Sequence, residues 1–238
     1  MPLTSIEPRR LYRQIAEQIR GLITSGEYLV GARLPPERDL AKQLRVSRPS
    51  VREALIALEV EELVEVRVGS GIYVRAPSHG INGGSGIHAG GFTQQAGPFE
   101  LIRARKAIEG ECAALAAKSA KRAQIANITG ALKQMEDDAH DMAPPLEADR
   151  LFHLRLAEGT NNAALVQVVK GLWEERGGPL FKKLHHHFDT PKSWSAAIRE
   201  HAAVLEAIRS HYPDAARTAM HYHMEQAAKR FSKSWDGK

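Results

Sequence analysis

The chain has 238 residues, enough for one large domain or two ordinary domains with cores of their own. Hydrophobic residues make up 43% and charged residues 26%, as in a soluble globular protein, and the lack of a long apolar run excludes a membrane-spanning one. The single cysteine, Cys112, excludes an intrachain disulfide framework, and without a signal-like N-terminus we expect a cytoplasmic protein.

The formal net charge of +5 is compatible with a nucleic-acid partner but is weak evidence for one. Residues 1–76 hold 12 Lys and Arg against 10 Asp and Glu, so binding would depend on where individual arginines lie. All 11 histidines lie at or beyond His79. Any histidine chemistry therefore belongs to the later part of the chain.

The first 76 residues predict three helices followed by a β-hairpin. The first helix has an apolar face at helical spacing, and Pro36 suits the first position of the second helix. Ser47 is a good N-cap for the third helix. The hairpin is predicted from the alternating Val64, Val66 and Val68 and from the turn Gly69-Ser70-Gly71. The residues of the first apolar face are Leu11, Ile15, Ile19 and Leu22.

The third predicted helix carries two arginines on one face. Arg48 and Arg52 are four residues apart, while Val51, Leu55 and Leu58 lie on the opposite side. A helix, a turn, a second helix and a hairpin in this order form a winged helix-turn-helix, which places a helix in the DNA major groove. We therefore expect residues 1–76 to be a DNA-binding domain.

Residues 77–97 are rich in Gly and Ser and have no hydrophobic period, so we expect a flexible linker. From residue 98 to 238 the pattern is almost entirely helical, which predicts a mainly α protein whose second domain is an all-α bundle. The segment 178–188 is left open. The helices predicted here are 98–119, 121–138, 144–158, 162–174, 193–210 and 213–233.

The first domain resembles the winged helix-turn-helix of GntR-type bacterial transcription regulators. The segments LPPERDLA, VSRPSVREAL and GSGIYV carry the resemblance. Two positions depart from it: Glu62 stands where related sequences often have Gly, and Val68 makes the wing tip apolar. The resemblance implies base and phosphate contacts, with the hairpin tip in the minor groove. The implied DNA-binding residues are Arg38, Ser47, Arg48, Pro49, Ser50, Arg52 and Gly69.

The second domain resembles the helical ligand-binding domain of the FadR-like branch of these regulators, the FCD type. ADRLFHLRLAEGTNNAAL at 148–165 and REHAAVLEAIRSHYPDAARTAMHYHMEQ at 199–226 carry this resemblance. The opening GPFELIRARKAIEGECAALAA is similar to regulators of hexuronate catabolism.

Four polar side chains on three predicted helices point toward one core. Asp149 and His153 are four residues apart on an inward helix face, and His201 and His223 lie on the inward faces of two later helices. One such histidine alone is usually a satisfied core residue, but burying all four groups without compensation would be costly. A divalent metal removes that cost, and zinc suits these ligands, with nickel or manganese as alternatives. The resemblance implies the same four ligands.

The remaining histidines are not expected to bind the metal. His221 is predicted on an exposed polar face, and adjacent residues such as His185, His186 and His187 point in different directions, as in a solvated loop or helix end.

The metal would leave coordination positions open for a small carboxylate effector, such as a sugar acid or a hydroxy acid. Arg105 is the candidate to pair with the effector's charge. The alternative for Arg105 is an ion pair with Glu109, four residues further on. Asn162 is a weaker candidate for the effector pocket.

Two functional classes remain open. The first is a transcriptional regulator, most simply a repressor, that reads a short palindromic operator as a homodimer and responds to the effector. The second is a metal-dependent enzyme acting on small organic acids, because Asp and three His can activate water. The sequence holds no further acid or base at a recognisable catalytic spacing, and the winged domain would be unexplained. We therefore expect a regulator and not an enzyme.

Overall fold

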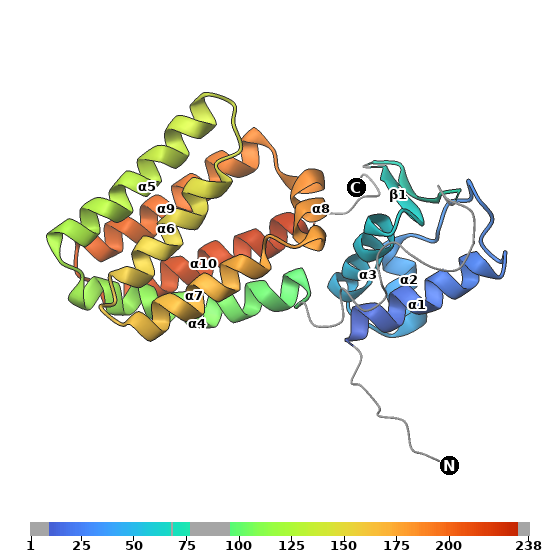
Figure 1. Cartoon of the computed structure of the whole chain (residues 1–238), viewed down its shortest axis with the longest axis horizontal. Coiled ribbons are helices and arrows are strands. Elements are labelled where there is room, and N and C mark those ends of the chain that lie inside the picture. The colour runs from blue at the N-terminus through green and yellow to red at the C-terminus, as the bar shows by residue number, and fades with distance from the viewer. Residues whose placement is uncertain (1–9, 68, 77–95, 233–238) are drawn as a thin grey trace, which may run out of the picture. The chain divides into compact units, whose positions relative to one another are not determined.

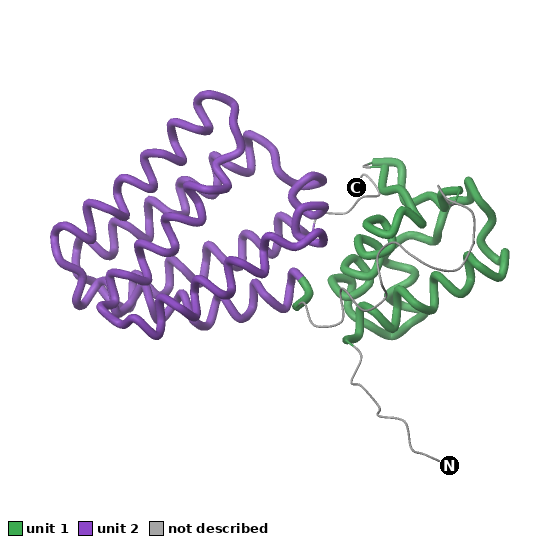
Figure 2. The backbone as a smooth tube through the Cα atoms, in the orientation of Figure 1, with its two compact units in different colours: residues 1–97, 234–238 green, residues 98–233 purple. Residues whose placement is uncertain are grey.

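The chain forms two compact units that meet in sequence between Gly97 and Pro98 (Figure 2). The computed structural model describes residues 10–67, 69–76 and 96–232. The predicted linker 77–97 thus lies almost wholly outside the described residues, as does Val68. Helices dominate both units, as expected for a mainly α protein (Figure 1).

The first unit has the predicted order of three helices and a hairpin. The two strands are antiparallel, with Val64 opposite Val74 and Arg67 opposite Gly71. The segment from Ala32 to Leu34 pairs with the second strand of the hairpin. Val74 N donates to Ala32 O at 2.9 Å, and Leu34 N donates to Ile72 O at 2.8 Å. The elements are α1 (Leu11–Thr24), α2 (Glu37–Leu44), α3 (Arg48–Val60), β1 (Val64–Arg67) and β2 (Gly71–Val74).

Two details of the first unit differ from the prediction. Pro36 lies just before α2 and not at its first helical position. Leu11 is 48% exposed, and the neighbouring Tyr12 is buried in its place. Both differences are shifts of one residue at a helix end, where local sequence is least decisive.

The second unit is a bundle of seven helices within the described residues. Helix α4 is its central element and packs against α6, α7, α9 and α10, while α5 lies against α6 and α9. Small residues of α4, among them Ala113, Ala116 and Ala117, are fully buried where the helices meet. The helices are α4 (Pro98–Ser119), α5 (Arg122–His140), α6 (Leu146–Glu158), α7 (Ala163–Glu175), α8 (Pro179–Phe188), α9 (Pro191–Arg209) and α10 (Pro213–Phe231).

The segment 178–188, for which no secondary structure was predicted, contains the helix α8. Helix α9 begins two residues earlier than predicted. Thr190 caps α9, because its side chain accepts from Ser193 N while Ser193 Oγ accepts from Thr190 N. Proline follows the cap in both helices, at Pro179 and Pro191, where its missing N–H costs nothing.

Cys112 of α4 is a buried packing residue. Burial raises the pKa of its thiol to about 12, which keeps it protonated and unreactive. None of the helices in the described part of the chain has the length and apolarity needed to span a bilayer.

Helix α3 ends in a left-handed turn at a residue that is not glycine. Glu62 has φ 60°, and Leu63 N donates to Leu58 O at 2.9 Å, as in a glycine-terminated helix. A side chain in this conformation is strained, whereas glycine adopts it freely. The substitution noted in the sequence therefore leaves the helix end intact at a cost in backbone energy.

Glu62→Gly should stabilise the first unit by about 0.5–1 kcal/mol, because it relieves this strain. Hydrogen exchange of the α3 amides in the full chain measures the effect. Glu62→Ala is the matched control, since it removes the same side chain but keeps the Cβ. Equal exchange rates in the two variants would contradict the explanation.

Candidate functional site

The first turn of α3 presents polar groups to solvent. Ser47 is the N-cap, and its Oγ accepts from Ser50 N at 3.2 Å. The Arg48 side chain is 47% exposed. Pro49 and Ser50 are half-buried and complete the turn. A helix start of this kind can offer N–H and O–H donors to a phosphate and a guanidinium to a base edge.

Two further predicted DNA-binding residues are also exposed in this unit. The Arg38 side chain on α2 is 70% exposed and lies 3.3 Å from Asp39. Gly69 lies in the hairpin turn with φ 79°, a conformation that favours glycine.

Arg52 departs from the prediction, because its side chain is only 1% exposed. Its Nη2 donates to Oε2 of Glu37, a buried residue on α2. Glu37 also accepts from Arg48 Nε at 3.1 Å. Arg48 and Arg52 do share a helix face, but at Arg52 that face is covered by Glu37 of α2. Arg52 therefore supports Glu37 and Arg48 in this structure and does not itself reach solvent.

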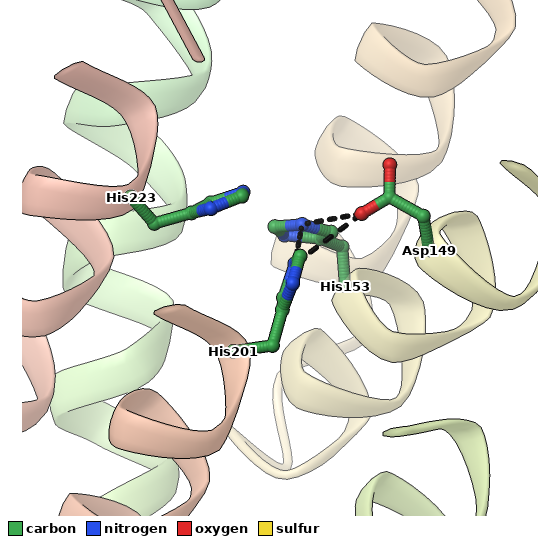
Figure 3. Close-up of side chains that lie close together, drawn as sticks. All are labelled: Asp149, His153, His201 and His223. Carbon is green, nitrogen blue, oxygen red and sulfur yellow. Dashed lines mark hydrogen bonds and ion pairs between the residues drawn. The ribbon is translucent and has the colours of Figure 1, made fainter. Parts of the chain in front are cut away.

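The second unit brings together the four predicted metal ligands (Figure 3). Asp149 and His153 come from α6, His201 from α9 and His223 from α10. One ligand atom from each lies within 4.8 Å of all the others. His201 Nε2 is 3.0 Å from His153 Nε2 and 3.3 Å from Asp149 Oδ1.

Two histidines of this cluster have Nδ1 hydrogen-bonded to an acceptor outside it, and the Nδ1 of the third lies beside a carboxylate without a hydrogen bond of ordinary geometry. His201 Nδ1 donates to Ala197 O at 2.7 Å, and His223 Nδ1 to Glu200 Oε2 at 2.9 Å. His153 Nδ1 contacts Glu109 Oε2 on α4. Because these oxygens only accept, the proton of each neutral ring lies on Nδ1 and the lone pair on Nε2.

Burial and neighbouring charges set the ionisation of the cluster. Burial lowers the pKa of His201 and of His223, which keeps these imidazoles neutral. Burial alone would raise the pKa of Asp149, but the neighbouring rings of His153 and His201 and the charge of Arg176 hold it well below its ordinary value. His201 and His223 thus offer neutral imidazoles, and Asp149 offers a carboxylate, at neutral pH.

These residues fit a divalent cation. Nitrogen and oxygen ligands of a tetrahedral zinc at roughly 2.1 Å lie about 3.4 Å from one another, close to the 3.0 and 3.3 Å from His201 Nε2 to its two neighbours, while the four atoms together lie within 4.8 Å. Without a cation, the Nε2 lone pairs of His153 and His201 face each other at 3.0 Å, which is unfavourable. Nickel or manganese would be accommodated by the same donors with more open positions.

Three arginines pair with the carboxylates around the cluster. Arg105 Nε donates to Glu109 Oε1 at 2.6 Å, so the ion-pair alternative for Arg105 is present in the structure. Arg176 Nη1 donates to Asp149 Oδ2 at 3.1 Å. Arg230 forms two hydrogen bonds with Glu200, at 2.6 and 3.0 Å.

Asn162, the other predicted effector residue, lies elsewhere. It is exposed and caps α7, because its Oδ1 accepts from Ala164 N at 3.0 Å and from Leu165 N at 3.3 Å. Residues 148–165 thus contain one segment that serves the cluster and one that serves a helix start. The expectation that Asn162 lines the effector pocket is not met.

The run His185–His187 forms the last turn of α8, as expected for a helix end, but His185 and His221 are less exposed than predicted. His185 belongs to α8 and is half-buried, with Nε2 3.0 Å from Arg176 Nη2 and Nδ1 2.8 Å from Asp189 Oδ2. His221 is also half-buried, because its ring packs against Gly110 of α4, where a Cβ would lie only 2.3 Å from Nε2. The contact with Asp189 follows the four-residue spacing of α8 itself, whereas those with Arg176 and Gly110 come from other segments and could not be read from spacing within one helix.

The cluster opens into two adjoining spaces. A small inner cavity of about 70 Å³ is lined by Asp149, His223 and the guanidiniums of Arg105, Arg176 and Arg230. An outer cleft of about 650 Å³ has basic and aromatic walls. Both spaces are lined by Leu146, Arg176, His185, Asp189 and Trp194. The cleft walls also include Arg150, Trp173 and Lys182.

Several residues of this site were not predicted. Arg176 lies at the end of α7 and stacks on Trp173, 4.0 Å from the ring centroid. Glu200 precedes His201 in sequence but holds His223 of another helix. Arg176 lies outside the segments that carry the resemblance, and Glu200 lies inside one but not on an apolar face, so spacing gave no signal for either role.

Comparisons with known proteins agree with both halves of the chain. The family model described as bacterial regulatory proteins, gntR family, matches residues 11–74, and the FCD domain model matches residues 100–226. The solved structure of E. coli McbR/YncC covers 93% of this chain and 97% of its own, with a TM-score of 0.50 and 21% identity, a likeness of fold alone.

Curated relatives match along nearly the whole chain. The Exu regulon transcriptional regulator of Escherichia coli (strain K12) is 39% identical over 92% of this chain and 83% of its own length. The Uxu operon transcriptional regulator of that strain is 38% identical over 93% and 87%. The HTH-type transcriptional repressor NanR of Klebsiella aerogenes is 31% identical over 92% and 85%.

Arg52→Ala should destabilise the first unit by about 3 kcal/mol, because it removes a buried partner of Glu37. Hydrogen exchange of the α2 and α3 amides in the full chain measures this loss. Arg48→Ala is the matched control: its side chain is half exposed, so its removal should cost less than about 1 kcal/mol. Equal protection in the two variants would show that the Glu37–Arg52 contact is not structural.

Proposed function

Because the chain belongs to the gntR family of bacterial regulatory proteins, carries an FCD domain and is a DNA-binding transcriptional regulator, we propose that it is a metabolite-controlled repressor of a catabolic operon. It acts in the cytoplasm as a homodimer on a short palindromic operator. The second unit holds a divalent metal, and a small carboxylate effector binds beside it. The observation that carries this proposal is the Asp149, His153, His201 and His223 cluster next to a basic cavity.

The exposed start of α3 supports the DNA-reading role. Arg48 keeps its Nη groups for a base edge while Glu37 holds its Nε. Arg38, Ser47 and Gly69 are also exposed and are candidates for phosphate or groove contacts. The name of the NanR relative supports repression in particular.

The charge balance of the second unit supports an anionic effector. The pairs Asp149–Arg176, Glu109–Arg105 and Glu200–Arg230 neutralise one another. A divalent cation adds two positive charges to this buried space, which is costly without a counter-ion. A carboxylate in the inner cavity supplies that counter-ion, and the metal would polarise and orient it.

The outer cleft supports a ligand with several oxygen atoms. Arg176 Nε and the indole Nε1 of Trp173 and of Trp194 are buried and lack a hydrogen-bond partner among the described residues. All three residues line the cleft. Hydroxyl groups of a sugar acid would supply the missing acceptors after a small side-chain rearrangement. The Exu and Uxu relatives, and the sequence likeness to hexuronate regulators, favour a sugar acid of this kind.

The effector would act by population shift. The dimer has an arrangement of its two DNA-binding units that binds the operator and one that does not. The effector must bind more tightly to the second arrangement. The required coupling is a difference in affinity between the two arrangements, and operator DNA must weaken effector binding by the same factor.

Arg48→Ala should reduce affinity for operator DNA, selected from random sequence with the wild-type chain, by roughly 10- to 100-fold, since one base contact of about 1–3 kcal/mol is lost. Fluorescence anisotropy measures this change. Arg122→Ala, which removes an exposed arginine of α5, is the control and should bind as the wild type does. Unchanged affinity of the Arg48 variant would refute the assignment of α3.

D-galacturonate and D-glucuronate should raise the melting temperature of the zinc-loaded chain, whereas D-galactose and D-glucose, which lack the carboxylate, should not. At about one hundred times Kd we expect a shift of roughly 5 °C or more, measured by differential scanning fluorimetry.

The double variant His201→Ala/His223→Ala tests whether the response to the acids depends on bound metal. This variant should lose bound zinc, measured by elemental analysis after dialysis, and the acids should no longer shift its melting temperature. Full zinc content in the variant would refute the metal centre. A zinc-loaded wild type that responds to neither acid would leave the metal but exclude these effectors.

A further inference from the structure

We propose that Glu109 and Glu200 are positioning residues that set how tightly the metal is held, each through one histidine and each balanced by one arginine. This inference rests on the proposed metal centre. It assigns a role to two carboxylates that do not themselves coordinate.

The first arginine–glutamate–histidine relay runs from α4 to α6. Glu109 is fully buried and lies between Arg105, at 2.6 and 3.3 Å, and His153 Nδ1. Arg105 donates to both Glu109 oxygens, as a guanidinium does to a carboxylate, and this carboxylate lies where it can fix the tautomer and orientation of His153.

The second relay has the same composition on other helices. Glu200 of α9 lies between Arg230 and His223 Nδ1, both on α10. Its side chain is 9% exposed. Arg230 donates to both Glu200 oxygens, and Oε2 also accepts from His223 Nδ1, so the ring is turned with Nε2 toward the other ligands.

A negative acceptor on Nδ1 makes the imidazole a stronger donor through Nε2 and fixes its direction. His201 differs, because its Nδ1 donates to the neutral carbonyl of Ala197. Two of the three histidines are thus strengthened by charge. The arginines are needed because an unpaired buried carboxylate would be costly.

The relays also connect the metal to the effector space. Arg105 and Arg230 both line the inner cavity. An anion that binds either guanidinium competes with the glutamate for it, and the freed glutamate then interacts more strongly with its histidine. Anion binding and metal binding should therefore support each other, by the same factor in both directions.

The test is the zinc affinity of the full chain, measured by competition with a chromophoric chelator. Glu200→Gln keeps the shape and an acceptor oxygen but removes the charge, and it should weaken zinc binding by roughly 10- to 100-fold. Glu109→Gln should act similarly. Glu200→Asp, which restores the charge, should recover part of the loss.

Glu111→Gln is the matched control. Glu111 accepts from Arg217 Nε at 2.6 Å and Nη2 at 3.0 Å, as Glu200 does from Arg230, but contacts no ligand of the cluster. The zinc affinity of the Glu111→Gln variant should stay within about threefold of that of the wild type. The absorption spectrum of the cobalt-loaded chain should change in Glu200→Gln and not in Glu111→Gln, which a purely structural effect would not produce.

Zinc affinity of Glu200→Gln equal to that of the wild type would overturn the proposal, even if the fully buried Glu109→Gln fails to fold. A wild-type chain that binds none of zinc, nickel and manganese would instead refute the metal centre itself. The two failures are therefore distinguishable.

Discussion

Burying charged and polar side chains in an all-helical core is the constraint on which the second unit depends. Each such group needs a partner, since an uncompensated one costs several kcal/mol. Asp149 and the three histidines face one another at the centre. The Nδ1 atom of each histidine and the second oxygen of Asp149 contact residues outside the cluster. Because these contacts occupy the Nδ1 atoms, the Nε2 atoms are left facing the centre of the cluster. A cation is the one component that would complete the arrangement.

The first unit solves a smaller version of the same problem. Glu37 is buried between two arginines, and only Arg48 extends into solvent. The exposed arginine is thereby held at one atom while its terminal nitrogens remain available. Both units thus use a buried carboxylate to orient an arginine or a histidine, although the two units share no sequence pattern.

Much of this could be predicted from the sequence, because periodicity and helix caps report on local structure. The elements of both units, the family and the convergence of Asp149, His153, His201 and His223 were predicted, since each ligand lies on an inward helix face. Arg52 shows where such reasoning stops. Its spacing from Arg48 placed it correctly on the helix, but its burial depends on Glu37, fifteen residues earlier on another helix. Glu200 and Arg176 escaped prediction for the same reason: their partners are distant in sequence.

The order of the parts along the chain has a consequence for biosynthesis. The first unit is complete at Val74, with a core of its own, whereas the last ligand of the cluster is His223 and its outer partner reaches to Arg230. At a synthesis rate of about 5–20 residues per second, roughly 10–30 s separate these points on the ribosome. A nascent chain therefore completes its helix-turn-helix before the last residues of the Asp149 cluster have been synthesised.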